Sequence, residues 1–239
     1  MRRMIIPIRK TGFVAAAIAF ALLALLPLRQ MLDLFAFDRL GLSARSATGS
    51  VWRGALHDAK VGSIVLGDVE TRLNLLPLLI GEARLTLDSS SRDGDFEVAV
   101  TRTRNSFGFE GLSGRFLLGG TALSLPISTM ETDGLSGRFS RGRCIAASGR
   151  MIVSAAGLAP MLGIPAAFQG TARCEGEAML IGLAGASAAE RLEIRLFADG
   201  RYRLDLMVRQ PDPAIGLRLT AAGFTRGPSG YAMTVSGEF

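Results

Sequence analysis

Apolar and polar residues alternate along much of the chain after residue 50. In the stretches DFEVAVTRTR (95–104), RLEIRLF (191–197) and RYRLDLMVRQ (201–210), apolar residues recur at every second position. Such alternation is typical of half-buried β-strands, which turn one face to a core and the other to water. AIGLRLTA (214–221) and YAMTVSGEF (231–239) continue the pattern, so we expect strands there as well.

Turn signals separate these runs at hairpin distances. Asp199–Gly200 joins two of them, QPDP (210–213) breaks the next pair and TRGPSG (225–230) breaks the last. Short Gly- and Pro-rich breaks between alternating runs are typical of antiparallel hairpins. The pattern therefore predicts an antiparallel meander over at least residues 190–239.

Helical patterns are scarce. SAAGLAPMLG (154–163) is compatible with one short helix, and LNLLPLLIG (73–81) is interrupted by Pro77. No linker rich in proline or charge divides the region, so we expect one domain. The predicted fold is mainly β: a curved, largely antiparallel sheet with at most one or two short helices.

A short phrase recurs along the predicted strands. SGRF stands at 113–116 and 136–139, SGRM at 148–151 and SGEF at 236–239. Glycine inside a strand usually marks a bulge, a bend or a close backbone approach, so these positions could bend successive strands into a curved sheet. The alternative is chance, because the chain has 29 glycines. The candidate strand-bend residues are Gly114, Phe116, Gly137, Phe139, Gly149 and Gly237.

The N-terminal region has a different pattern. Residues 11–28 carry no charge and follow a basic segment, and the whole chain is 49% hydrophobic with a mean hydropathy of +0.33. Eighteen helical residues rise about 27 Å, close to the hydrocarbon thickness of a bilayer. We therefore expect a basic cytoplasmic tail (1–10), a single transmembrane helix (11–32), a connector (33–48) and a β-rich domain (49–239) beyond the membrane. The alternative is a cleaved signal peptide, which would have a shorter apolar run and a small-x-small cleavage site.

The charge does not favour nucleic acid as a partner. The isoelectric point is about 10.3, but removing the four basic residues of the tail leaves 23 Lys and Arg against 21 Asp and Glu. The remaining arginines are dispersed rather than gathered in a basic stripe with aromatic residues. We therefore expect no nucleic-acid partner.

The two cysteines, Cys144 and Cys174, lie in the part predicted to be outside the cytoplasm. An even count in an oxidising compartment favours a disulfide. Two unrelated buried thiols are the alternative. Two cysteines and one histidine are too few for a zinc site.

The sequence shows no catalytic or cofactor motif. GLSGR misses the G-x-S-x-G nucleophile elbow by one position, and there is no phosphate-binding loop. His57 is the only histidine, and we expect it to be a surface residue. We therefore expect neither an enzyme nor a bound cofactor or metal.

The start of the β-rich part carries the most informative stretch. GSVWRG (49–54) contains the only tryptophan, and we expect Gly49 and Gly54 to bracket a short strand whose Trp52 packs into the core. With the basic N-terminus, the span, LNLLPLLIGEARLTL (73–87) and GTARCEG (170–176), this stretch resembles the type II secretion system protein N family. The resemblance covers nearly the whole chain.

The resemblance implies a non-catalytic accessory component in the bacterial inner membrane, with a single span and most of the chain in the periplasm. Its partners would be other envelope components of the secretion machinery, bound through the β domain. Two alternatives stay open. The concave apolar face could hold a lipid acyl chain, or YAMTVSGEF (231–239) could be the terminal strand of an outer-membrane β-barrel.

Overall fold

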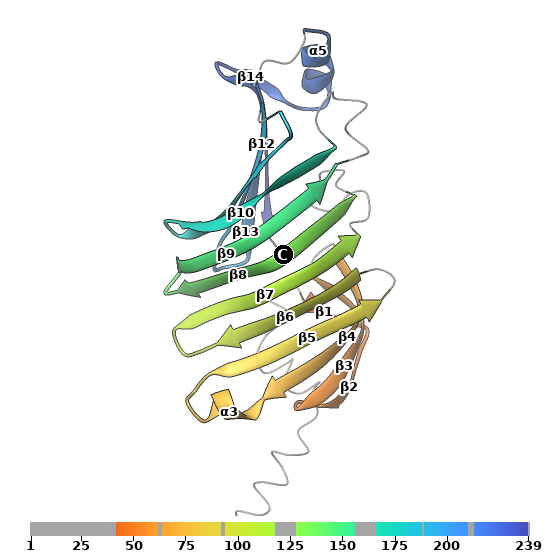
Figure 1. The fold of residues 1–239 in the computed structure, drawn as a ribbon, viewed down its shortest axis with the longest axis vertical. Coiled ribbons are helices and arrows are strands. Elements are labelled where there is room, and N and C mark those ends of the chain that lie inside the picture. Colours follow the sequence, from red (N-terminus) through yellow and green to blue (C-terminus); the bar gives the residue numbers. More distant parts are fainter. Residues whose placement is uncertain are drawn as a thin grey trace, which may run out of the picture.

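The computed structural model describes residues 42–61, 64–91, 94–117, 128–155, 166–187, 189–209 and 213–238. Most of these residues are in strands (Figure 1). The first strands are β1 (Leu42–Ser43), β2 (Ser46–Ser50), β3 (Arg53–Val61), β4 (Ile64–Asn74), β5 (Ala83–Ser91), β6 (Gly94–Arg102), β7 (Ser106–Leu117) and β8 (Thr129–Ser140). The others are β9 (Arg143–Ser154), β10 (Ala167–Glu175), β11 (Ala178–Ala184), β12 (Glu190–Leu196), β13 (Arg201–Val208), β14 (Thr225–Gly227) and β15 (Gly230–Glu238), with the helices α3 (Leu75–Leu78) and α5 (Pro213–Ala221).

All the described strands belong to one antiparallel sheet. From β3 to β13 each strand pairs with the next in the chain, and the order is β1-β3-β4-β5-β6-β7-β8-β9-β10-β11-β12-β13-β15-β14. β2 lies off this path and pairs with β3. The end strands β1 and β14 do not pair with each other, so the sheet stays open. The predicted antiparallel meander is confirmed.

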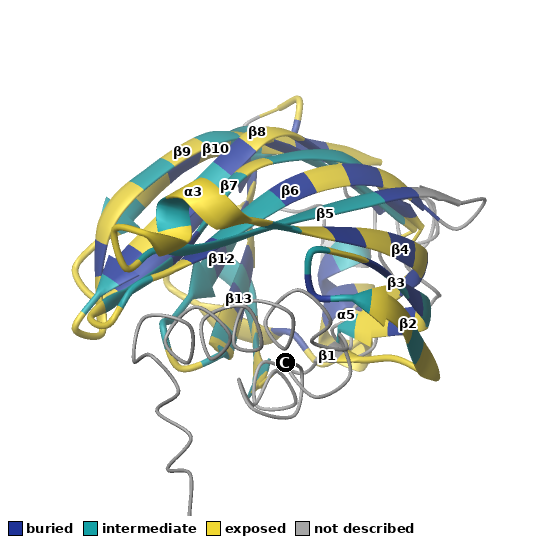
Figure 2. Ribbon diagram, turned by 90° about the horizontal axis from the view of Figure 1, so that it is seen from below, coloured by how far each residue is buried: buried dark blue, intermediate teal, exposed yellow. Residues whose placement is uncertain are grey.

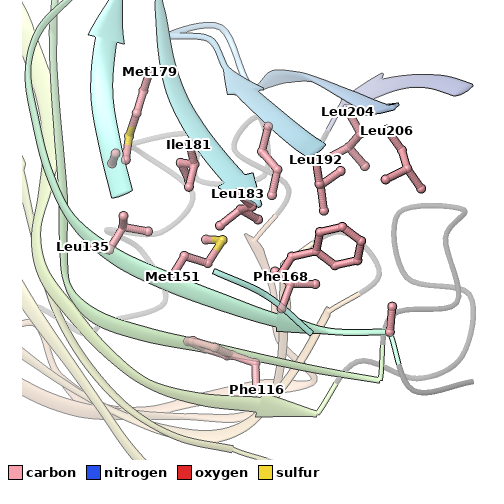
Figure 3. Close-up of a cluster of buried hydrophobic side chains, with 14 of the residues drawn as sticks. Phe116, Leu135, Met151, Phe168, Met179, Ile181, Leu183, Leu192, Leu204 and Leu206 are labelled. Atoms are coloured by element: carbon pink, nitrogen blue, oxygen red, sulfur yellow. The ribbon is translucent and has the colours of Figure 1, made fainter. Parts of the chain in front are cut away.

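The sheet arches, and its buried side chains line the concave face (Figure 2). In β6, Gly94, Phe96 and Val98 are buried while Asp95 and Glu97 are exposed, as the alternation predicts. Side chains from β7 to β13 converge on one interior (Figure 3). Within the described residues, one face of a long sheet thus supplies most of a continuous hydrophobic cluster.

Irregular pairing accompanies the curvature. The ladders β3–β4, β6–β7, β7–β8 and β8–β9 each contain register shifts. A β-bulge inserts an extra residue into one strand, bends it and increases the local twist. The strands with bulges therefore curve while their apolar side chains stay on the concave face.

One predicted strand is wrong. Residues 214–221 lie in helix α5, not in a strand. Ile215 and Leu219 are four residues apart and so share one helix face, and Leu219 is fully buried. Pro213 suits the first helical position, because its missing N–H would have no partner there. Eight residues with apolar side chains at every second position can form either a strand or a helix. Here a helix forms, with Leu219 packed in the hydrophobic cluster.

Two helices occur among the described residues, within the expected limit of one or two. α3 occupies part of the segment interrupted by Pro77. Most of the possible helix at 154–163 lies outside the described residues, as do the predicted tail (1–10) and transmembrane helix (11–32). Within the described part of the chain, no helix is long and apolar enough to cross a bilayer. β1 and β2 fall mostly in the range assigned to the connector.

Candidate interaction surfaces

The last strand of the sheet presents an edge with no described strand beside it. β15 pairs along its length with β13, but β14 covers only Gly230–Ala232 on its other side. A two-residue turn joins Gly227 to Gly230, and N–H groups alternate between the two sides of a strand. The N–H groups of Thr234, Ser236 and Glu238 therefore point to the uncovered edge.

The opposite end of the sheet is a short hairpin. Gly49 and Gly54 pair with each other, so they face across the β2–β3 hairpin and do not bracket a strand as expected. Val51 and Trp52 form the turn, and Val51 is the buried residue while Trp52 is half-buried. The expectation that a strand carries Trp52 into the core is therefore wrong, because Trp52 lies in the turn and stays half-buried.

Three side chains near this hairpin have the connectivity of a catalytic relay. Thr48 Oγ1 lies 3.3 Å from His57 Nε2, and His57 Nδ1 lies 3.3 Å from Asp68 Oδ1. The side chains of His57 and Asp68 are 43% and 70% exposed, so water screens their charges. Asp68 Oδ1 also accepts the N–H of Asp58, which adopts a left-handed conformation at the β3 bulge. The arrangement therefore supports the bulge, which is a structural role.

A shallow hollow of about 900 Å³ lies on the outer face of β3–β7. Glu70, Asp88 and Glu97 are direct cross-strand neighbours there, and Asp68 and Asp95 also line it. Like charges directly opposite on neighbouring strands destabilise a sheet. A partner that covers this hollow would have to bring basic groups. Within the described residues, no cluster of His, Cys, Asp or Glu has the arrangement of a metal site.

The predicted disulfide is confirmed. Cys144 and Cys174 are bonded, with their Cα atoms 5.4 Å apart. The β9–β10 ladder runs only from the pair Ala167–Ser154 to the pair Thr171–Arg150. The disulfide therefore joins the two strands where their backbone pairing has ended.

The four glycines of the repeated phrase have two kinds of surroundings. Gly114 and Gly149 have positive φ values of 154° and 104°. A Cβ at Gly114 would lie 2.6 Å from Phe96 Cα, and one at Gly149 would lie 2.6 Å from Leu135 N. Both positions therefore combine a backbone conformation favoured by glycine with a close approach of the neighbouring strand.

Gly137 and Gly237 instead leave room for a neighbouring side chain. A Cβ at Gly137 would lie 2.7 Å from the sulfur of Met179, and one at Gly237 would lie 2.6 Å from Tyr202 Oη. The bending role expected for these glycines stays a prediction, but each of the four copies has a local steric reason for glycine.

The aromatic residues of the phrase lie in the core. Phe116 and Phe139 are buried, and Phe116 stacks on Phe96 with ring centroids 5.3 Å apart. Both belong to the continuous hydrophobic cluster of the concave face, which does not include Trp52. Among the described residues, Phe116 and Phe139 therefore pack with side chains of neighbouring strands.

An ion-pair network on the outer face ties the C-terminal strands together. Arg195 lies 2.8 Å from Glu193, 2.9 Å from Asp205 and 3.4 Å from Glu175. Burial by itself lowers the pKa of the Arg195 guanidinium, but the three carboxylates outweigh it and the pKa is raised. Thr234 donates a hydrogen bond to Asp205, so the network reaches β15. This network could not be predicted from the sequence, because its residues come from four strands.

Comparison with known proteins agrees with the resemblance. The family model described as type II secretion system (T2SS), protein N, matches residues 40–234. Searches of curated proteins and of solved structures found no match. Because the family model covers most of the chain, the protein belongs to the type II secretion system protein N family.

Proposed function

We propose that this component of the type II secretion machinery is a non-catalytic, single-span accessory protein of the bacterial inner membrane. Its β domain lies in the periplasm and binds other envelope components of the machinery. Family membership makes the chain a component of that machinery. The Cys144–Cys174 disulfide supports an oxidising compartment for the domain, because such bonds are rare in the cytoplasm.

The observation that carries the proposal is the uncovered edge of β15, residues 233–238. Unpaired N–H and C=O groups on a strand edge can pair with another chain. Addition of a strand to such an edge is a recurring mode of peptide recognition, in which the main chain supplies hydrogen bonds. The partner segment is therefore an extended stretch of another envelope component.

The residues around the edge suit this role. Thr234, Ser236 and Glu238 are exposed, while Met233, Val235 and Gly237 are half-buried on the other face. An added strand would thus extend both the polar outer face and the apolar concave face of the sheet. A partner segment with alternating apolar and polar residues fits this edge best.

The test is a proline substitution on the edge. Ser236→Pro removes an N–H that faces the uncovered side and leaves the β13 ladder intact, whereas Ser236→Ala keeps that N–H. In cells that depend on this protein for secretion, we expect Ser236→Pro to reduce release of a type II substrate and Ser236→Ala to leave it unchanged. Thermal unfolding checks that both variants fold. Normal secretion by a folded Ser236→Pro variant would overturn the proposal.

The alternative of a lipid held on the concave face has less support. The buried side chains of that face form one continuous cluster, with Phe116 and Phe139 inside it. The hollow on the outer face of β3–β7 carries five acidic side chains, which do not suit an acyl chain. Protein binding through the edge is therefore the function that the geometry supports best.

A further inference from the structure

A shallow pocket at one rim of the sheet gathers arginines. It has a volume of about 380 Å³ and lies between the β6–β7 turn (103–105) and the β8–β9 turn (141–142). Figure 1 shows both turns at the rim that also carries α3. Arg102, Arg104 and Arg141 line this rim pocket, and no acidic residue does. The pocket itself therefore does not neutralise its positive charge.

The three arginines are not engaged elsewhere. None of the ion pairs within the described residues includes one of them. Asp199 follows the lining residue Ala198 in the chain, but its carboxylate pairs with Arg201 at 2.7 Å. All three guanidinium groups belong to exposed residues, so an anion from outside can reach them.

Hydrogen bonds hold the two turns side by side. The carbonyl of Asn105 accepts the N–H of Arg141 and the hydroxyl of Ser140, each at 3.3 Å. Within the β6–β7 turn, the hydroxyl oxygens of Thr103 and Ser106 are 2.7 Å apart, and the Ser106 N–H donates to Thr103 Oγ1. The backbone around the pocket is therefore fixed before a ligand arrives, which reduces the entropic cost of binding.

The backbone of Arg141 is an independent sign that its side chain has a role. Arg141 has a φ of +50° and forms a two-residue turn with Gly142, whose φ is +78°. Hairpin turns of this kind favour Asn-Gly, because long side chains are costly at positive φ. Asp58 is the other described non-glycine residue with a positive φ, and aspartate tolerates this conformation better. A strained position that keeps an arginine points to a function of its guanidinium group.

The chemistry of the rim pocket suits a phosphate monoester. Guanidinium groups bind phosphate oxygens through pairs of parallel hydrogen bonds. Three positive charges exceed the single charge of a carboxylate and come closer to the charge of a phosphate monoester, about −1.5 to −2 at pH 7. The N–H groups of Arg104 and Asn105 have no acceptor among the described residues, so the turn offers further donors. Phe107 and Ala198, both half-buried, give the organic part of an ester an apolar surface.

We propose that the rim pocket binds a phosphate monoester group through Arg102, Arg104 and Arg141. The group can belong to a soluble ester or to a lipid headgroup, which share this chemistry. The pocket contains no residue of the β15 edge, so the inference does not rest on the proposed strand addition.

The test is isothermal titration calorimetry on the full-length protein in a non-ionic detergent at constant ionic strength. Phenyl phosphate is the probe, and benzoate is the matched anion with a carboxylate in place of the phosphate. We expect benzoate to bind about tenfold more weakly than phenyl phosphate, because it makes fewer charged hydrogen bonds. Phosphatidic acid added to the same micelles distinguishes the sources: competition with phenyl phosphate indicates a headgroup, and no competition indicates a soluble ester.

Variants separate binding from folding. Arg104→Gln and Arg141→Gly should each weaken the binding of phenyl phosphate about tenfold. Arg141→Gly also relieves the positive φ, so its thermal unfolding temperature should not fall. The matched control is Arg191→Gln, at an exposed arginine of β12 without an ion pair among the described residues, and it should bind phenyl phosphate normally.

Three results would overturn the inference: no binding of phenyl phosphate, equal binding of benzoate, or binding that both pocket variants retain. A polyglutamate peptide that needs the same arginines, and that phenyl phosphate does not displace, would also overturn it. The pocket would then receive an acidic segment of a partner protein. Because the titrations contain no other secretion component, none of these results bears on the proposed function.

Discussion

At the scale of single residues, the recurring SGR phrase has a steric explanation. Gly114 and Gly149 occupy positive φ values next to a neighbouring backbone, and Gly137 and Gly237 make room for Met179 and Tyr202. The sequence suggested that these glycines matter to the strands, but it could not separate the two reasons. Both steric reasons depend on which strand lies beside each glycine, and the four-residue repeat does not specify that strand.

The steric reason can be tested at Gly149. Gly149→Ala forces a Cβ into the backbone of Leu135, while Gly134→Ala, at a φ of +59°, meets nothing within 4 Å. Gly134→Ala should cost about 1–2 kcal/mol from the backbone conformation alone. Gly149→Ala should cost about 1–3 kcal/mol more, because overpacking adds to that strain. Chemical denaturation measures both values, and equal costs would contradict the close approach at Gly149.

At the scale of elements, the strands could be predicted because nearly every one is half-buried. In β6 and β13 the buried face and the exposed face alternate as the sequence does. α5 could not be predicted in this way, because its apolar residues satisfy both a strand and a helix until the position of the core is known. The hairpin at Gly49 and Gly54 was missed because the turn between them carries two apolar residues rather than the usual turn residues.

The disulfide provides a prediction at the same scale. It closes a loop of 30 residues and joins β9 to β10 beyond the end of their ladder. On the chain-entropy estimate, removing it with Cys144→Ala and Cys174→Ala together should lower the free energy of unfolding by about 3–4 kcal/mol. Hydrogen exchange should accelerate first in the β10–β11 hairpin, since the cysteine end of β10 loses its link to β9. Unchanged exchange there would contradict this role.

At the scale of the whole molecule, the described residues form an open sheet with a continuous hydrophobic cluster, an edge at β15 that no described strand covers and an exposed apolar turn between β4 and β5. The antiparallel order of the last strands follows from the alternation and the turn signals of the sequence. The uncovered edge does not, because it depends on β14 being only three residues long while β15 has nine. The apolar segment 73–81 was visible in the sequence, but its exposure was not, because apolar residues usually lie inside a fold.

In the proposed function, the β15 edge binds another component of the secretion machinery. The most direct measurement is photo-crosslinking in cells, with a photoreactive residue at Ser236 on that edge or at Arg150. Arg150 is exposed but lies in β9, which has a paired strand on both sides. We expect Ser236 to form an adduct with a secretion component identified by mass spectrometry, and Arg150 to form none. The same adducts at both positions, or none at Ser236 while the protein supports secretion, would contradict this expectation.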